Sequence, residues 1–261
     1  MGISIDGAAV LVTGASSGIG AATAVALAER GATVGLVARR ADRLDEVLHR
    51  CRTHAPDSQR WAVDLSDLDA ASGVADTAWN AFNGLDAVIN NAAIPKRRRA
   101  TDLSGDELER VLRTNFLSPA HIALRVLPRM IQQGRGVVVN VSSLAGRLGV
   151  PNEAAYSASK FALCGWSESL AIDLAGTGVE VRLVVPGAID TEIWQQPDND
   201  PPLYDGPKES PDAVARAIIE AMQRDGFETY VPDLRSIVEL KTSDPDAYLE
   251  GAVSFRDAAH G

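Results

Sequence analysis

The feature that most constrains this chain is an alternation of short apolar runs with longer helical patterns, which continues from Ala8 to Val185. The runs are rich in β-branched residues and almost continuously apolar, which is typical of strands buried on both faces of a sheet. They are Ala8–Thr13, Ala32–Ala38, Trp61–Asp64, Leu85–Asn90, Gly136–Val141 and Val179–Val185. The helical patterns between them include Ile19–Arg30, Asp67–Phe82 and Asn152–Leu174. This alternation predicts an α/β, doubly wound and mostly parallel sheet of about seven strands with helices on both faces.

No linker interrupts this pattern, so we expect one domain over residues 1–261. The long irregular stretch Gly187–Pro211 is rich in proline, and a loop of that length inside a domain predicts a lid over a binding site. A helix at Asp212–Arg224 and a short strand at Thr229–Val231 are expected after it. The sequence pattern assigns no structure to the tail, Thr242–Gly261.

Composition excludes several classes of function. The formal net charge of −10 argues against general affinity for nucleic acid or anionic lipid. No secretory leader and no apolar run long enough to cross a membrane are visible. Two scattered cysteines are more typical of a reducing compartment than of a disulfide framework, so we expect a cytoplasmic protein. The four histidines form no cluster with metal-ligand spacing, and we predict no metal.

A glycine-rich turn, Thr13-Gly14-Ala15-Ser16-Ser17-Gly18-Ile19-Gly20, follows the first strand pattern and opens the first helix. Glycines at these three spacings allow a sharp turn, close approach of backbone to a pyrophosphate, and tight packing of helix on strand. The N-terminus of the helix then presents unpaired N–H groups and a positive dipole end to phosphates. We therefore predict a dinucleotide site, against the alternative of a plain structural turn. Its contacts are expected from Gly14, Ser16, Ser17, Gly18, Ile19 and Gly20.

The residues after the second strand indicate which dinucleotide is bound. An NAD site places an acid there for the ribose 2′-hydroxyl, whereas an NADP site places arginine near the 2′-phosphate. This chain has Arg39 and Arg40 at that place, and the nearest acids, Asp42 and Asp45, belong to the next helix. The pattern favours NADP(H) over NAD(H); the alternative is that the two arginines only begin a solvated helix.

A possible proton-transferring pair lies at the start of a later helix, in Tyr156-Ser157-Ala158-Ser159-Lys160. Residues four apart share a helix face, so that the Tyr156 phenol and the Lys160 ammonium can converge. A free tyrosine has a pKa of about 10, and a nearby cation lowers it towards neutral pH. Ser143 ends the fifth strand pattern, at the sheet edge where ligands of such folds bind, and its hydroxyl can reach a substrate oxygen.

Taken together, these motifs resemble the short-chain dehydrogenase/reductase family in its compact single-domain form with a Rossmann fold. The resemblance extends from about Ala8 to Thr191. The motifs that carry it are the TGxxxGxG turn at Thr13–Gly20, Asp64-Leu65, Asn90-Asn91-Ala92-Ala93, Asn115, Ser143, Tyr156 with Lys160, and Pro186-Gly187. Several motifs in the right order are far more specific than any one alone.

The resemblance implies further cofactor contacts. Asp64 would hold the adenine ring with Leu65 beside it, and Asn91 would line the adenine-ribose side. The backbone at Ile189, with Thr191, would face the nicotinamide carboxamide. The implied set of cofactor residues also includes Pro186 and Gly187, together with Tyr156 and Lys160.

The resemblance also implies catalytic roles. Tyr156 would be the general acid and base, and Lys160 would bind the nicotinamide ribose while lowering the pKa of the tyrosine. Ser143 would polarise the carbonyl. Asn115 would hold a water that links Lys160 to solvent.

Two positions depart from the family pattern. Ala93 stands where the family usually has glycine. Ser17 stands where many NADP-using members have a basic residue, so that recognition of the phosphate would depend on Arg39 and Arg40.

The function expected is hydride transfer between NADP(H) and a carbonyl or secondary alcohol. The alternative from another class is a catalytically silent nucleotide-binding sensor or scaffold. An epimerase or dehydratase is less favoured, because such relatives usually have a larger C-terminal substrate domain than this chain. Relatives often form homodimers or homotetramers, and the same is expected here.

The substrate is expected to be a small carbonyl or alcohol, but its identity and the physiological direction are not readable. Leu144, Leu148, Val150 and Trp194 hint at a bulky apolar substrate, although the same residues can simply pack the lid. The basic run Lys96–Arg99 is interpreted as a solvated loop, with steering of an anionic substrate as the less favoured alternative.

Overall fold

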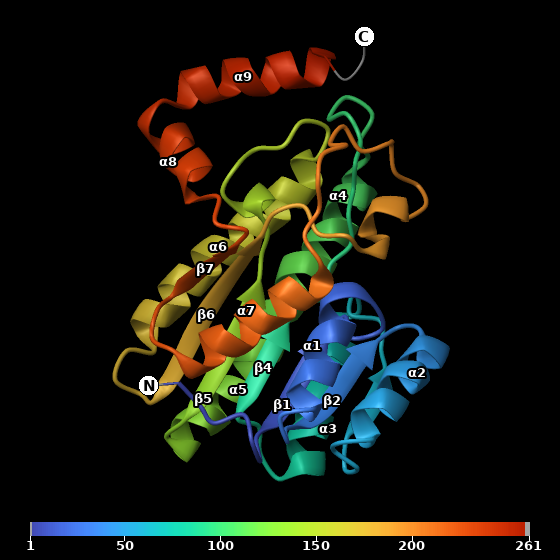
Figure 1. The fold of residues 1–261 in the computed structure, drawn as a ribbon, viewed down its shortest axis with the longest axis vertical. Helices are drawn as coiled ribbons and strands as arrows, with labels where there is room; N and C mark the ends of the chain where they lie inside the picture. Colours follow the sequence, from blue (N-terminus) through green and yellow to red (C-terminus); the bar gives the residue numbers. More distant parts are fainter. Residues whose placement is uncertain (1, 259–261) are drawn as a thin grey trace.

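A parallel β-sheet forms the centre of the molecule (Figure 1). The computed structural model describes residues 2–258. Its strands are β1 (Ala9–Thr13), β2 (Thr33–Ala38), β3 (Gln59–Ala62), β4 (Ala87–Asn90), β5 (Gly136–Val141), β6 (Val179–Pro186) and β7 (Glu228–Val231). They lie in the order β3-β2-β1-β4-β5-β6-β7, and every neighbouring pair is parallel. The prediction of a doubly wound parallel sheet is confirmed, and its strand order reverses between β1 and β4.

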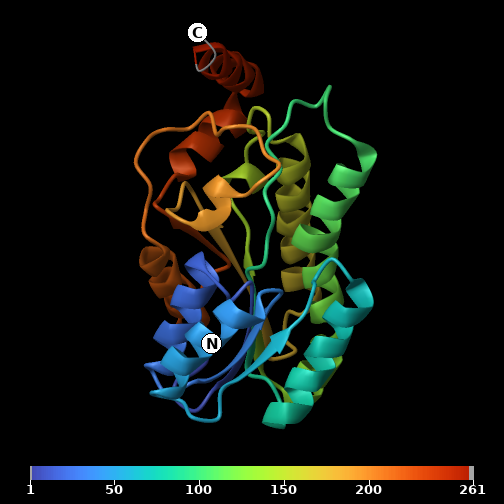
Figure 2. The same ribbon diagram turned by 90° about the vertical axis from the view of Figure 1, so that its right-hand side faces the viewer.

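Helices cover both faces of the sheet (Figure 2). One apolar cluster joins the sheet to α1 (Gly18–Ala28), α2 (Ala41–Arg52) and α7 (Pro211–Gln223). A second joins the other face to α3 (Leu68–Phe82), α5 (Ser118–Gln133) and α6 (Ala154–Asp173). Side chains alternate across a strand, so that Val10 and Val12 belong to the first cluster while Leu11 belongs to the second. Burial of both faces explains why the strands are apolar along their whole length.

A π-helical turn, η1 (Arg113–Leu117), joins α4 (Gly105–Leu112) to α5. Such a turn holds one residue more than an α-helical turn, and it occurs frequently at functional sites. Asn115 lies in this turn and is completely buried. The turn therefore brings the polar side chains of Thr114 and Asn115 into the interior.

The loop after β6 is more ordered than the lid expected over 187–211. Its two ends are joined by a parallel bridge between Ile189 and Glu209. A short 3-10 helix, η3 (Glu192–Gln195), begins directly after Thr191, whose hydroxyl accepts a hydrogen bond from the Ile193 N–H. We call residues 187–211 the 187–211 loop below.

The tail also contains regular structure that the sequence analysis did not assign. It forms α9 (Pro245–Ala258) and the end of α8 (Arg235–Ser243), and both helices extend beyond the layered body at its upper end in Figure 1. Neither helix contains a buried residue. Residues 259–261 of the predicted tail lie outside the described residues. Within residues 2–258, no helix combines the length and apolar character needed to span a membrane.

Candidate active site

A cavity of about 250 Å³ lies at the carboxyl edge of the sheet. It is lined by residues that directly follow β1, β2, β4 and β5, and by residues of the 187–211 loop. This is the place where the strand order reverses, and open parallel sheets bind ligands at such a point. The cavity brings together many of the predicted site residues: Gly14, Ser16, Ser17, Gly18, Ile19, Arg39, Arg40, Asp64, Leu65, Asn91, Tyr156, Lys160 and Thr191.

The glycine-rich turn is shaped by close backbone contacts. Gly14 has a φ of +67°, and a Cβ there would lie 2.8 Å from the Ala92 Cα. A Cβ at Gly20 would lie 2.3 Å from the Gly14 carbonyl oxygen, so that α1 can approach β1 only without one. Gly20 is not a lining residue of the cavity; it acts by permitting this approach.

The N-terminus of α1 has no side-chain cap. Ser17 is the N-cap residue, but it makes no side-chain hydrogen bond to the helix. Its hydroxyl instead accepts a 2.7 Å hydrogen bond from Arg40. The first N–H groups of the helix are therefore open to an anion, and they face the cavity with the positive end of the helix dipole.

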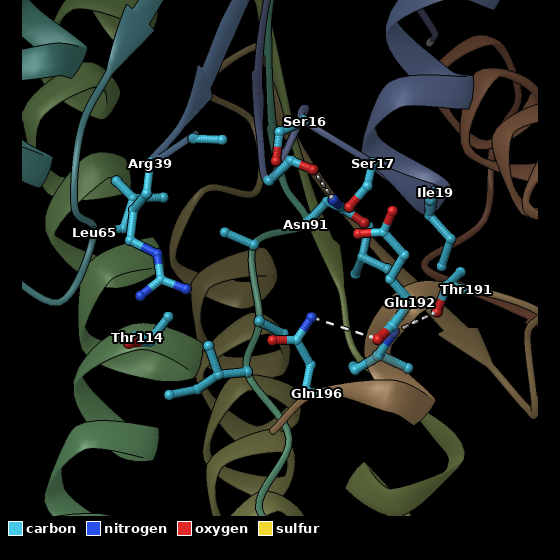
Figure 3. Close-up of a pocket in the computed structure, with 18 of the residues that line it drawn as sticks. Ser16, Ser17, Ile19, Arg39, Leu65, Asn91, Thr114, Thr191, Glu192 and Gln196 are labelled. Carbon is cyan, nitrogen blue, oxygen red and sulfur yellow. Dashed lines mark hydrogen bonds between the residues drawn. The ribbon is translucent and has the colours of Figure 1, made fainter. Parts of the chain in front are cut away.

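The two arginines after β2 differ in the hydrogen bonds and ion pairs that their side chains make. Arg40 bonds to Ser16 and Ser17 and pairs with Glu192 of the 187–211 loop at 2.9 Å. Arg39 extends into the cavity towards Thr114 (Figure 3), and no hydrogen bond or ion pair of its side chain is found within residues 2–258. Arg39 therefore has its guanidinium donors available to a ligand, whereas those of Arg40 are largely used.

The side chains expected at the adenine end lie beside Arg39. Burial raises the pKa of Asp64, but hydrogen bonds from Ser66 and the nearby Arg39 lower it by more, so that the carboxylate stays ionised. Leu65 lines the cavity next to it. Asn91 also lines the cavity, but its amide nitrogen donates to the Thr13 carbonyl at 3.0 Å. Asn91 thus also holds the end of β4 against the glycine-rich turn.

Tyr156 and Lys160 meet at the other end of the cavity. The Lys160 Nζ lies 5.8 Å from the centre of the Tyr156 ring and donates to the Val141 carbonyl at 2.9 Å. Lys160 is 2% exposed, and burial lowers its pKa to about 8. A buried ammonium needs such hydrogen bonds, because it has lost most of its hydration.

The pKa of Tyr156 is raised, not lowered as the sequence analysis expected. Burial is the largest cause, and the carboxylate of Glu153 adds to it, while a hydrogen bond with Ser143 lowers the pKa in part. Lys160 does not offset the burial, because its ammonium bonds to a backbone carbonyl rather than to the phenol. The phenol is therefore protonated at neutral pH.

Ser143 lies next to Tyr156 at the start of a short 3-10 helix, η2 (Leu144–Gly146). Its hydroxyl accepts a hydrogen bond from the Ala145 N–H at 3.2 Å and interacts with the Tyr156 phenol. The two hydroxyls thus lie close together, although Ser143 does not itself line the cavity.

Asn115 is buried next to the site and does not line the cavity. Its side chain bonds to both backbone polar groups of Ile94 and donates to the Ser159 hydroxyl at 3.0 Å. The Ser159 hydroxyl donates in turn to the Tyr156 carbonyl. Asn115 therefore ties the loop after β4 to the first turn of α6, which supports the position of Tyr156.

The remaining predicted residues, Pro186, Gly187 and Ile189, do not line the cavity. Ile189 is buried, and the N–H of Gly187 donates to the Val231 carbonyl at 2.9 Å. Pro186 ends β6. These three residues support the start of the 187–211 loop, while Thr191 reaches the cavity itself.

The interpretation of Lys96–Arg99 as a solvated loop is wrong for Lys96 and Arg97, while Arg99 is exposed. Lys96 and Arg97 are 6% and 4% exposed. Lys96 pairs with Glu107 at 2.6 Å and with Asp198 at 2.9 Å. Charge alone suggested solvation, but these partners lie in other segments of the chain and cannot be read from the run itself.

Arg97 connects the loop after β4 to the 187–211 loop. Its guanidinium donates to the carbonyls of Ile193, Trp194 and Asp200. The backbone of the same loop is bonded to the turn before α6, since the Arg98 N–H donates to the Asn152 carbonyl at 2.6 Å. We call Lys96, Arg97 and Arg98 the clamp, because they fix the 187–211 loop beside the cavity.

Trp194 packs within the 187–211 loop and does not line the cavity. Its indole N–H donates to the Ile189 carbonyl at 2.6 Å, and its ring lies 6.4 Å from that of Tyr204. Trp194 therefore packs the loop, and of its two expected roles it is this one that the structure shows.

Sequence reasoning missed several residues that line the cavity. Glu192, Ile193 and Gln196 come from the 187–211 loop, while Arg110 and Thr114 come from the helical stretch before α5. Figure 3 shows Glu192 and Gln196 across the cavity from Arg39. No local motif marks them; only the four-residue spacing of Arg110 and Thr114, which would place both on one face of a helix, carried a signal. Among residues 2–258, no group of three or more His, Cys, Asp and Glu side chains is placed to hold a metal.

Comparison with known proteins agrees with this geometry. A model of the short chain dehydrogenase family matches residues 8–201, and the chain belongs to this family. The chain is 32% identical over 229 residues to the oxidoreductase YxnA of Bacillus subtilis, covering 85% of this chain but 64% of that protein. It is 31% identical over 246 residues to the ketoacyl reductase HetN of a Nostoc species, covering 90% of this chain and 83% of HetN.

A solved structure shows the same fold. It is a metagenomic short-chain oxidoreductase in complex with NADP, which is 32% identical to this chain. The match covers 87% of this chain and 96% of the other, with a TM-score of 0.73. The fold and the family are thus established on independent grounds.

Proposed function

We propose that this protein is an NADP(H)-dependent oxidoreductase that interconverts a carbonyl and an alcohol. The observation that carries the proposal is the meeting of a protonated tyrosine and a buried lysine in the same cavity as an uncapped, glycine-rich helix N-terminus. A nucleotide-binding scaffold needs the second feature but has no need of the first. Membership of an oxidoreductase family supports the same conclusion.

The residues present fit a dinucleotide. The open N–H groups of α1 suit a pyrophosphate, and the missing Cβ at Gly14 lets the glycine-rich turn beside them pack directly on the Ala92 backbone. Asp64 and Leu65 would hold the adenine end, while Tyr156, Lys160 and Thr191 would hold the nicotinamide end. When bound, the cofactor supplies the hydride to a carbonyl carbon or accepts it from an alcohol.

Tyr156 would transfer the proton. Because burial keeps the phenol protonated, Tyr156 is ready to donate to the oxygen of a carbonyl substrate. The Ser143 hydroxyl would hold that oxygen, since it already interacts with the phenol. Lys160 would replace the lost proton or stabilise the phenolate, and its pKa of about 8 is matched to that task.

We propose a preference for NADP(H) because the two arginines differ in whether their guanidinium donors are free or already bonded. Arg39 points into the cavity with its donors unused, as a ligand phosphate requires. Arg40 would contribute charge from its position between Ser16, Ser17 and Glu192. The NADP found in a structural neighbour supports this choice.

The test is turnover of a ketone and aldehyde panel with NADPH by the wild type and by Tyr156→Phe. We expect the variant to lose roughly 10²–10⁴-fold in kcat, the usual contribution of an acid–base group, while the Kd for NADPH stays within twofold. A Tyr156→Phe variant with full activity would contradict the mechanism. Tight NADPH binding without turnover of any panel member by the wild type would favour the scaffold.

We further propose a cytoplasmic homodimer or homotetramer assembled through α5 and α6. Leu124 and Ile131 on α5, and Phe161 and Ile172 on α6, are large apolar residues left exposed, with Ile172 at 76%. Cys51 and Cys164 are both buried free thiols, in keeping with a reducing compartment. Light scattering should give a mass of two or four chains; a single-chain mass at micromolar concentration would contradict the assembly.

A further inference from the structure

The 187–211 loop lies directly against the glycine-rich turn. A Cβ added at Gly18 would lie 3.0 Å from the Thr191 Cγ2, so that Thr191 packs on the first residue of α1. Glu192 follows at once and begins η3, and both Thr191 and Glu192 line the cavity. The loop therefore brings a carboxylate to the side of the cavity where the phosphates of a dinucleotide are proposed to bind.

The Glu192 carboxylate is held by two arginines that follow β2. Its Oε2 lies 2.9 Å from the Arg40 Nη1, and its Oε1 lies 3.8 Å from the Arg43 Nη2. The hydrogen bond from Arg40 is the largest cause of the lowered pKa of Glu192, so that the carboxylate is ionised at neutral pH. Figure 3 shows Glu192 on the same side of the cavity as Ser17 and across from Arg39.

Glu192 completes the set of bonds that Arg40 makes. The Arg40 Nη2 donates to the Ser17 hydroxyl at 2.7 Å and to the Ser16 hydroxyl at 3.2 Å, while Nη1 pairs with Glu192. The Nε donates to Ser16 at 3.4 Å. A guanidinium presents its donors as a planar fork, and carboxylates and phosphates bind that fork in the same way. Glu192 therefore occupies the place on Arg40 that a phosphate would use.

The two nicotinamide dinucleotides differ in whether they need this place. NADP(H) carries a 2′-phosphate with a charge of about −1.5 to −2 near neutral pH, whereas NAD(H) carries a neutral hydroxyl there. A phosphate beside Arg40 would compete with the Glu192 carboxylate and would also be repelled by it. The hydroxyl would leave the ion pair in place. The pair itself adds little to stability, since its side chains are 41% and 42% exposed, so its main consequence is for ligand binding.

We propose that Glu192 is a specificity-determining residue for the cofactor, whose carboxylate competes with the 2′-phosphate for Arg40 and so limits the preference for NADP(H). Arg39, whose donors are unused, would give the phosphate its first contact. Arg40 would join it when the carboxylate is displaced. This inference rests on the proposed dinucleotide site.

The experiment measures the Kd for NADPH and for NADH by nicotinamide fluorescence and takes the ratio of the NADH value to the NADPH value. The pyrophosphate is common to both cofactors, so that its repulsion by Glu192 cancels in this ratio. Glu192→Gln keeps the size of the side chain and removes its charge. We expect the ratio to rise by about fivefold, the upper end of what a half-exposed ion pair contributes. A merely structural contact would change both Kd values alike.

The control is Glu209→Gln, which removes the same charge from an exposed residue of the same loop that does not line the cavity. It should leave the ratio unchanged. A second comparison tests whether Glu192 acts through Arg40: in an Arg40→Leu background, Glu192→Gln should raise the ratio by less than twofold.

An unchanged ratio in Glu192→Gln, an equal rise in Glu209→Gln, or a full rise that persists without Arg40 would overturn the role of Glu192, while the dinucleotide site stands. A wild type that binds neither NADPH nor NADH would instead count against the proposed function and, with it, this inference.

Discussion

The two ends of the cavity differ in the atoms that form them: backbone at one end and side chains at the other. The end beside α1 is made by backbone: a glycine turn with positive φ, an uncapped helix N-terminus, and strand ends in close contact. The end beside α6 and the 187–211 loop is made by side chains, among them Tyr156, Lys160 and Gln196. Arg97 lies behind this lining and holds the loop by hydrogen bonds to three backbone carbonyls. The first end tolerates few substitutions, because backbone atoms in a fixed conformation form its binding surface. The second can change its ligand through single side chains.

The largest effect is expected at the backbone end, from Gly14→Ala. The added Cβ would lie 2.8 Å from the Ala92 backbone and would also force a left-handed conformation on alanine. We predict that the Kd for NADPH rises by roughly a hundredfold or more, since the turn must shift away from the pyrophosphate. Nicotinamide fluorescence titration measures this change.

Gly134→Ala is the matched control. Gly134 has nearly the same φ, +72°, but a Cβ there meets nothing within 4 Å. It should therefore lose stability from backbone strain alone and bind NADPH normally. Equal Kd values for the Gly14→Ala variant and the wild type would show that the glycine turn is only structural.

An intermediate effect is expected from Glu153→Gln on stability, because the raised pKa of Glu153 makes folding depend on pH. The folded protein holds this proton up to about pH 7, whereas an unfolded glutamate loses it near its ordinary value of 4.5. Wild-type stability should therefore fall as pH rises between these values. Arg97 remains charged and Tyr156 protonated throughout, so that neither of these facing groups titrates in the window.

Glu153→Gln removes this cost. We predict that it stabilises the protein by about 2 kcal/mol more at pH 8 than at pH 5, a value reduced for partial exposure. Denaturant unfolding at the two pH values measures the difference. Equal stabilisation by Glu153→Gln at the two pH values would show that the Glu153 carboxyl is not shielded from water.

The smallest effect is expected from Arg97→Leu, which removes the bonds between the clamp and the 187–211 loop. We predict that KM for ketones rises about tenfold while the Kd for NADPH is unchanged, because the loop no longer rests beside the substrate end. Arg99→Leu is the control, since Arg99 belongs to the same basic run but is exposed. Equal KM values in the two variants would contradict a role for the clamp.

The sequence predicted the backbone end well because local rules determine it. Buried parallel strands must be apolar, and the glycines of the turn are required by close contacts that any residue with a Cβ would break. The predicted strands match β1, β2, β4, β5 and β6 to within two residues at each end. The expected third strand started two residues too late, since β3 pairs with β2 on one side only and begins with the polar residues Gln59 and Arg60.

The side-chain end was predicted poorly because its partners are distant in the sequence. The Lys96–Asp198 pair spans 102 residues, and nothing in either segment identifies the other. Burial of Lys96 and Arg97 depends on that pairing, so that a local charge count predicted the opposite. The helices α8 and α9 were also missed, since they bury no residue and so lack a clear apolar stripe. The π-helical turn at Asn115 has no sequence signal that we recognised.

We propose that the cavity holds NADP(H) through the free guanidinium of Arg39. Titration of the wild type, Arg39→Ala and Arg50→Ala with NADPH and with NADH, followed by nicotinamide fluorescence, tests it most directly. Arg50→Ala removes the same charge from the exposed side of α2, away from the cavity. We predict that NADPH binds more tightly than NADH to the wild type, and that only Arg39→Ala weakens NADPH binding, by about tenfold or more. Tighter binding of NADH, or an equal loss in both variants, would contradict the account.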